Sequence, residues 1–141
     1  MNEVITLVPP SAPCLRKPAI EVSNISDIET YITPMRQLML ENNGVGLAAP
    51  QCGIGLRFFL TNTENFPVVV NPKILGVYGY RISAPEGCLT WPGRTTFVPR
   101  REAITAEWTD MKGESKISII RGVEARIFQH EMDHLNGVCI F

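Results

Sequence analysis

The chain has 141 residues, of which 45% are hydrophobic and 19% charged, and its formal net charge is −1. This length suits one domain (1–141) with one core, and the near-neutral charge without a basic run gives no electrostatic case for nucleic-acid binding. No apolar stretch reaches membrane-spanning length, and the N-terminus has neither the basic region nor the long apolar region of a signal peptide.

Residues 1–24 are punctuated by prolines and are expected to wrap the surface of the domain. A helix is predicted next, over residues 26–44. Ser26 and Glu29 have the spacing of a capping box at its start, and Asn43-Gly44 is typical of its end. Apolar residues recur between them at helical spacing: Ile28, Ile32, Met35 and Met39.

Pro34 falls inside this pattern. Either one helix kinks there, or Thr33 caps a shorter helix that has Pro34 at its first position. We favour one helix.

The segment from residue 54 to 120 contains short stretches rich in β-branched and aromatic residues, separated by turns that contain Gly, Pro or Asn. The stretches are LRFFLTN, PVVVNPKIL, TTFVPR, AITAEWTD and KISII. Their short connections favour antiparallel strands. Strands and helices do not alternate along this segment, as they would in a parallel sheet. The fold class is therefore α+β.

The last predicted helix is GVEARIFQHEMDHLNG, and it is apolar on two opposite faces. Four side chains fall within roughly 60° of one another: Val123, Ile127, His130 and His134. Ala125, Phe128, Met132 and Leu135 cover the other side. Such a helix is buried, so we expect antiparallel β-sheets packed around it, with the helix of residues 26–44 as the one N-terminal helix. Gly137 fits a C-cap glycine.

This helix carries H-E-x-x-H, with the only two histidines of the chain. Residues four apart stack on successive turns, so His130 and His134 can converge on one divalent ion, with Glu131 close to a metal-bound water. The alternative is a pair of core histidines satisfied by hydrogen bonds. A catalytic metal needs a third ligand, and only Cys139 qualifies downstream of His134. The third ligand is therefore Cys139 or an upstream cysteine or carboxylate, and spacing alone leaves this open.

Three segments resemble the signature motifs of the peptide deformylase family. GVGLAAPQ (44–51) is similar to G-x-G-L-A-A-x-Q, EGCLT (86–90) to E-G-C-L-S, and QHEMDHLNG (129–137) to Q-H-E-x-D-H-L-x-G. Their order and separations also fit, and LRKPA near the N-terminus resembles the early Leu-Arg segment of the family. The resemblance covers nearly the whole chain and implies Cys88 as the third metal ligand.

The resemblance implies removal of the formyl group from N-formylmethionyl peptides, with release of formate. A metal ion held by Cys88, His130 and His134 would activate a water molecule, and Glu131 would take its proton and deliver it to the departing amine. The Gln51 amide and the backbone N–H of Leu89 would help to hold the oxyanion. Thr90 stands where the family usually has serine and keeps the hydroxyl.

In the family, substrate binds as an added strand, which implies backbone partners near Val45 and Gly87. Gly44 and Gly46 allow unusual backbone angles and the close approach of another chain. The methionine side chain would enter a pocket lined by Val45, Val123, Ile127 and His130, although plain core is the alternative for the aliphatic residues. Glu86 and Arg100 resemble a buried pair that braces the cysteine turn, and Asp133 either orients a histidine or is solvated.

The expected cofactor is Fe²⁺, with Zn²⁺ as the alternative and with Ni²⁺ or Co²⁺ able to support activity. The partners are nascent formylmethionyl peptides, without nucleic acid or membrane, and the chain is expected to be a cytoplasmic monomer. It stops at Phe141, where typical bacterial members continue into a helix associated with ribosome docking. This ending resembles short phage-encoded members, and it leads us to expect weak or no ribosome docking and, for a phage protein, the host cytoplasm.

Three rival functions remain. Cys139 together with Cys88 and the two histidines would make a closed structural metal site. A metalloprotease lacks its usual downstream ligand here. The last rival is an inactive deformylase-like protein, although every residue that the chemistry needs is present.

Overall fold

The structure is a computed structural model that describes residues 4–141, and it confirms the α+β class. Two α-helices, α1 (Glu29–Glu41) and α2 (Gly122–Leu135), accompany three short 3-10 helices, η1 (Pro13–Arg16), η2 (Ile25–Asp27) and η3 (Ala49–Cys52). The strands form a single antiparallel sheet of five, in the order β1-β2-β3-β4-β5. Within the described residues, no helix is long and apolar enough to cross a membrane.

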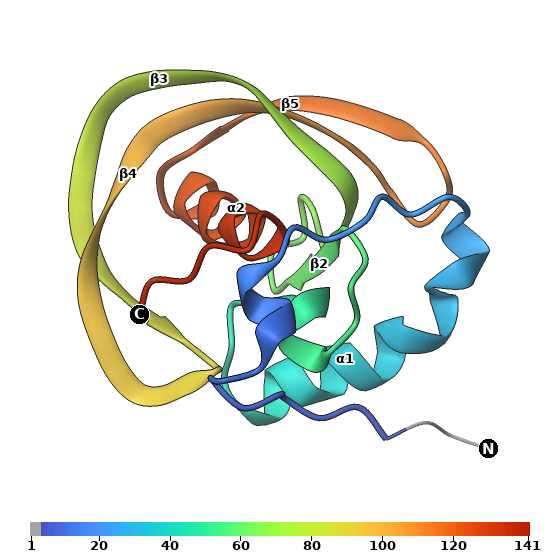
Figure 1. Ribbon diagram of the computed structural model, residues 1–141. Helices are drawn as coiled ribbons and strands as arrows, with labels where there is room; N and C mark the ends of the chain where they lie inside the picture. Colours follow the sequence, from blue (N-terminus) through green and yellow to red (C-terminus); the bar gives the residue numbers. More distant parts are fainter. Residues whose placement is uncertain (1–3) are drawn as a thin grey trace.

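The sheet is dominated by two long strands that curl around α2 (Figure 1). Its strands are β1 (Gly46–Ala48), β2 (Phe58–Thr61), β3 (Val68–Cys88), β4 (Trp91–Thr109) and β5 (Ser115–Arg121). The pairing of β3 with β4 shifts register at several points, and such bulges bend and twist a strand pair. The stretches TTFVPR and AITAEWTD, predicted as separate strands, belong to one continuous β4, which ends at Thr109.

The prolines and glycines around Cys88 predict a tight irregular turn, but this segment is a β-hairpin. Pairing continues to Cys88 and resumes at Trp91, so only Leu89 and Thr90 form the turn of a hairpin. Pro85 and Gly87 lie in the paired part of β3, whereas Pro92 and Gly93 fall within a register shift of β4. The hairpin fixes the place of Cys88 through backbone hydrogen bonds.

The first part of the sheet is covered on both faces, which explains the continuous apolar run of β2. Phe59 packs in a cluster with Phe128 of α2, whereas Phe58 and Leu60 pack in a second cluster with Met35 of α1. Successive side chains of a strand point to opposite faces, so a strand buried on both sides needs apolar residues at every position. The sheet thus separates the two helices.

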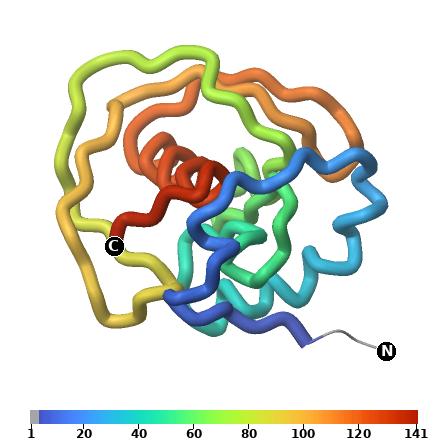
Figure 2. The backbone as a smooth tube through the Cα atoms, in the orientation of Figure 1, coloured from blue at the N-terminus to red at the C-terminus, as the bar shows by residue number. Residues whose placement is uncertain are grey.

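Helix α2 is buried on two faces, as predicted, and lies inside the curve of β3 and β4 (Figure 2). On one face Phe128 makes edge contacts with Phe59 at 5.1 Å and with Phe66 at 5.6 Å between ring centroids. The other face carries the two histidines. Gly137 follows the helix with φ 77°, which confirms the C-cap glycine.

The predictions for Pro34, for the start of α1 and for the residues after α2 have different outcomes. Helix α1 runs through Pro34 as one helix, which confirms the favoured alternative. The capping box is wrong: α1 begins after Ile28, which makes no side-chain cap, because Ser26 is taken up by η2 and Ile28 is drawn into the core. The residues after the helix, VCIF, also suggest an outgoing strand, but this prediction is wrong, because residues 138–141 pair with no strand.

Candidate metal centre and active-site cleft

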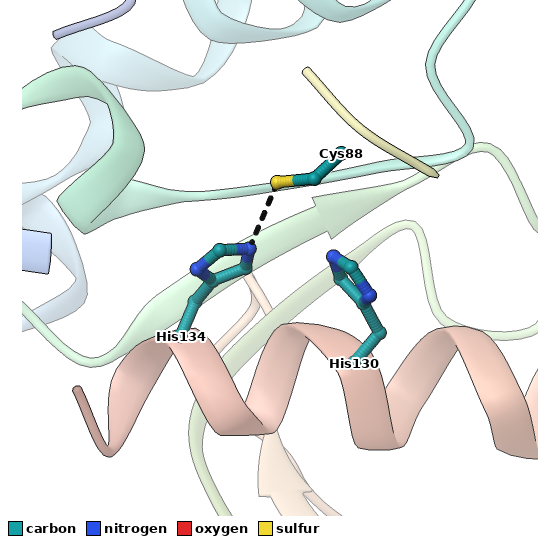
Figure 3. A group of neighbouring side chains, drawn as sticks. All are labelled: Cys88, His130 and His134. Atoms are coloured by element: carbon teal, nitrogen blue, oxygen red, sulfur yellow. Dashed lines mark hydrogen bonds between the residues drawn. The ribbon is translucent and has the colours of Figure 1, made fainter. Parts of the chain in front are cut away.

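Cys88 and the two histidines meet although they come from different elements. Cys88 ends β3, and His130 and His134 project from successive turns of α2 toward it (Figure 3). One potential ligand atom from each residue lies within 4.8 Å of the others, and Cys88 Sγ lies 3.3 Å from His134 Nε2. The i, i+4 spacing and the hairpin together produce a three-ligand group.

The ring of His130 is held by Glu86. Nδ1 of His130 lies 2.8 Å from Glu86 Oε1, so the ring donates a hydrogen bond there and leaves Nε2 for a ligand. Glu86 accepts further hydrogen bonds from Arg100 at 2.9 and 3.0 Å and from Arg126 at 2.6 Å. Burial acts to raise the pKa of Glu86, but the hydrogen bonds from His130 and Arg100 outweigh it and lower the pKa to about 2. Glu86 therefore stays ionised.

The charge states of the two histidines differ without a metal. Burial lowers the pKa of His134 to about 3, so its imidazole is neutral, which is the form that binds metals. Burial also acts to lower the pKa of His130, but contacts with Cys88 and Glu86 raise it to about 10. The carboxylates of Glu86 and Glu131 therefore favour a positive charge at this position.

The donor set fits a divalent metal ion. A thiol and two imidazoles suit zinc, iron(II), cobalt or nickel. Oε1 of Glu131 is buried and has no hydrogen-bond partner within residues 4–141, as expected for a group that awaits a water or a substrate. The group offers three potential protein ligands, a number typical of a catalytic rather than a structural site.

Glu131 is buried between the metal group and β1. Its side chain packs against Gly46 so closely that a Cβ at residue 46 would lie 2.9 Å from Glu131 Cδ. Neither Gly44 nor Gly46 has a positive φ, so Gly46 is needed for this contact and not for an unusual backbone angle. Burial raises the pKa of Glu131 to about 7, a value suited to proton transfer near neutrality.

Gln51 is fixed in orientation by both ends of its amide. Its Oε1 accepts a hydrogen bond from Ala48 N at 2.9 Å. Its Nε2 then donates to Thr90 Oγ1 at 3.0 Å and lies 3.3 Å from Cys88 Sγ. The hydroxyl kept at residue 90 thus holds the amide donor beside the metal group.

A cleft of about 610 Å³ opens onto these residues. Val45, Gly46 and Leu89 line it on one side and Val123 and Ile127 of α2 on another, and it also reaches Gly44, Glu86 and Gly87. Val45 is 51% and Val123 74% exposed, so neither is core. The aliphatic residues named from the sequence are thus gathered at one cleft.

Two candidate residues lie elsewhere. Cys139 donates a hydrogen bond to Leu15 O at 3.5 Å and is not part of the three-ligand group. Asp133 bonds Arg100 at 2.5 Å and contacts neither histidine ring within hydrogen-bond distance. Arg100 links Asp133 to Glu86, so Asp133 contacts the site only indirectly, through Arg100.

Sequence reasoning missed Arg126. It lies one helical turn before His130 and donates to Glu86 as well as to the carbonyls of Val98 and Ile82. Arg126 is spaced i, i+4 from a candidate metal-binding histidine, and this spacing was a signal that the two side chains could share an acidic partner.

A family profile, sequence relatives and solved structures all relate this chain to one protein family. Residues 4–141 match the profile of the Polypeptide deformylase family. A Peptide deformylase of Thermotoga petrophila is 44% identical over 130 residues, which are 91% of this chain and 79% of that protein. The crystal structure of the Thermotoga maritima enzyme superposes with a TM-score of 0.92 at 38% identity, covering 98% of this chain and 95% of that one. The enzyme of the Vibrio parahaemolyticus bacteriophage VP16T, solved with actinonin, gives a TM-score of 0.90 at 34% identity, covering 96% of this chain and 100% of that one.

Proposed function

This chain belongs to the polypeptide deformylase family, and from that membership we propose which of its residues and which ion carry the reaction. The enzyme is a metal-dependent hydrolase that removes the N-formyl group from newly made peptides. The observation that supports the residue assignments best is the convergence of Cys88, His130 and His134 within 4.8 Å beside the buried, unpartnered carboxylate of Glu131.

Cys88, His130 and His134 would hold the metal ion. We propose Fe²⁺, with Zn²⁺ as the alternative and Ni²⁺ or Co²⁺ as active replacements, because a thiolate with two imidazoles accommodates all four. When bound, the ion supplies Lewis acidity, which polarises the formyl carbonyl and makes water a stronger acid. Glu86 fixes the ring of His130 for this task, and Arg100 and Arg126 fix Glu86.

Glu131 serves as the general base and then as the general acid. Its carboxylate accepts a proton from the attacking water and returns it to the amine of methionine as the C–N bond of the formamide breaks. Formate and a free N-terminus are the products, so no other reactant is needed. The buried position that brings its pKa to about 7 supports both steps near neutral pH.

Gln51 and the backbone N–H of Leu89 stabilise the oxyanion that develops on the formyl oxygen. Gln51 suits this role because Ala48 and Thr90 leave its amide no rotational freedom. Donors fixed in this way are worth about 3–4 kcal/mol each in comparable sites.

The peptide binds along β1. Within residues 4–141 this strand is at the edge of the sheet and pairs with β2 alone, so its other edge can accept an extended chain at Val45 and Gly46. Gly87 provides a backbone partner on the opposite wall. The methionine side chain occupies the space between Val45, Val123, Ile127 and His130, all of which line the cleft.

The remaining assignments concern the setting of the reaction. We propose that the chain is one catalytic domain, acts as a cytoplasmic monomer on nascent peptides, and binds ribosomes weakly. The net charge of −1 supports weak binding, since it offers little electrostatic attraction to a polyanionic partner.

Anaerobic purification with metal analysis, followed by a formate-release assay on formyl-Met-Ala-Ser, tests the assignment. We expect one metal ion per chain and formate release that stops on chelation. Metal without activity would favour the closed structural site. Cys139→Ala distinguishes the two, because the enzyme keeps its metal and rate in this variant whereas a four-ligand site loses affinity.

A further inference from the structure

Arg94 stands apart from the other charged side chains of the cleft. The cleft is lined by six ionisable residues: Glu86, Cys88, Arg94, Arg126, His130 and Glu131. The two carboxylates are buried, and Arg126 is engaged with Glu86 and with two backbone carbonyls. Arg94 is exposed, and within residues 4–141 it makes neither an ion pair nor a side-chain hydrogen bond. The open part of the cleft is therefore cationic, and Arg94 supplies the unpaired charge.

Arg94 is nevertheless held in place. Its Cζ lies 4.1 Å from the ring centroid of Phe141, which is a cation–π contact. Phe141 in turn packs on Trp91 with 5.7 Å between ring centroids. The Cζ atom of Arg16 lies 5.8 Å from the centroid of the Trp91 ring. Arg16 also donates to the main-chain oxygen of Phe141 at 2.8 Å. These four residues from three distant segments form a stack, which we call the rim stack.

The rim stack determines which part of Arg94 can bind. A guanidinium that stacks by its face keeps the N–H donors at its edge available, and those donors match a carboxylate in a bidentate arrangement. The stack also removes part of the side-chain freedom that an exposed arginine would lose on binding. Trp91 and Arg94 both line the cleft, so this preorganised donor is next to bound peptide.

We propose that Arg94 is a specificity-determining residue that favours formylated peptides with a carboxylate downstream of the formylmethionine, and that Phe141 positions it. This inference rests on the proposed function. The ligand group is the side chain of Asp or Glu in a nascent peptide, or the terminal carboxylate of a short peptide. Because the contact is remote from the scissile bond, it acts on KM and leaves kcat unchanged.

The test uses formylated, C-terminally amidated alanine peptides that start with Met and carry Glu, Gln or Lys at the second, third or fourth position. At low salt, the wild type should prefer Glu over Gln by about threefold in kcat/KM at one of these positions, because exposed ion pairs contribute little more. At the same position, the Lys peptide should have a lower kcat/KM than the Gln peptide. The preference should weaken at high salt.

Arg94→Ala should bring the Glu/Gln ratio to one while leaving kcat on the Gln peptide unchanged. Arg81→Ala is the matched control, because this exposed arginine of β3 does not line the cleft. It removes the same charge and should keep the ratio. Phe141→Leu keeps an apolar side chain but removes the aromatic face. It should lower the Glu/Gln ratio of kcat/KM values while leaving kcat/KM on the Gln peptide unchanged. Phe141→Ala removes the large side chain altogether and should lower the Glu/Gln ratio as well.

The outcomes separate the proposals. No formate from any peptide contradicts the proposed function itself. Normal turnover of the Gln peptides with a Glu/Gln ratio of one at every position overturns the role of Arg94. That role is equally overturned if Arg81→Ala lowers the ratio as much as Arg94→Ala. A ratio unchanged in both Phe141 variants overturns the positioning role of Phe141.

Discussion

Gly46 and Glu131 are packed so tightly that only hydrogen fits between the backbone of β1 and the carboxylate of α2. A Cβ on Gly46 would lie 2.9 Å from Glu131 Cδ and 3.0 Å from its Cγ. Such contacts are closer than van der Waals packing allows, so a side chain at residue 46 must displace the carboxylate.

Gly46→Ala should therefore lower kcat at least tenfold while the metal content stays at one ion per chain. The physical reason is that a displacement of about 1 Å in a catalytic group costs up to about a hundredfold in rate. Formate-release kinetics and metal analysis check this. Gly55→Ala is the control, since its Cβ meets nothing within 4 Å and should leave both quantities unchanged. A Gly46→Ala enzyme with wild-type kcat would show that Glu131 tolerates movement.

Much of this site could be predicted because its signals are local. The spacing of His130 and His134 and the two apolar faces of α2 depend only on helical geometry, and the structure has both. Cys88 was different: the sequence spacing left several cysteines open, and the family resemblance selected it. Now the position of Cys88 at the end of a hairpin explains how it reaches a helix that begins 34 residues later.

The support of the site could not be predicted in the same way. Glu86 and His130 are 44 residues apart, and Glu86 and Arg126 are 40 apart, so their contacts depend on how β3 and β4 curl. That curvature accompanies register shifts in β3, and the glycines Gly76 and Gly79 mark two of them without indicating which distant residues the bend brings together. The capping box failed for a related reason, because burial of Ile28 decided where α1 begins.

Glu86→Gln should weaken metal binding by about ten- to a hundredfold, as loss of a partner that orients a ligand does. Glutamine can still accept from His130 Nδ1 through its oxygen, but its NH₂ group then faces Arg100 Nε and Arg126, which are also donors. Competition with a chelator measures the affinity. Glu64→Gln, at an exposed position, is the control. Equal affinities in the two variants would remove Glu86 from the metal site.

Acid should abolish the contribution of Glu86 to stability. Its pKa is lowered from 4.5 to about 2, so the ionised group stabilises the fold above its unfolded pKa, and this stability is lost as the pH falls through the folded pKa. Urea unfolding of wild type and Glu86→Gln, both with chelator, should show a constant gap above pH 4.5 that narrows between pH 4.5 and about 2. A gap that widens on acidification would contradict the assignment.

Gly137→Ala should destabilise the fold by about 2–4 kcal/mol, because two penalties combine there. Gly137 has φ 77°, and its Cβ would lie 2.8 Å from the backbone of Arg16 and Lys17. Gly113→Ala separates the penalties, since Gly113 has φ 80° with nothing within 4 Å and should cost about 1–2 kcal/mol. Urea unfolding measures both. Equal losses would show that the end of α2 can move away from residues 16 and 17.

The role of Glu131 is the central claim, and one variant tests it directly. Glu131→Ala leaves Cys88, His130 and His134 in place and removes only the carboxylate, so it should keep one metal ion per chain. Loss of general acid–base catalysis should lower kcat on formyl-Met-Ala-Ser by at least about a hundredfold. Glu21→Ala, at an exposed position, should match the wild type. Metal analysis and formate release on the same Glu131→Ala preparation decide the matter: full metal with a hundredfold lower kcat is the predicted result, and full metal with a near-wild-type kcat would contradict the mechanism.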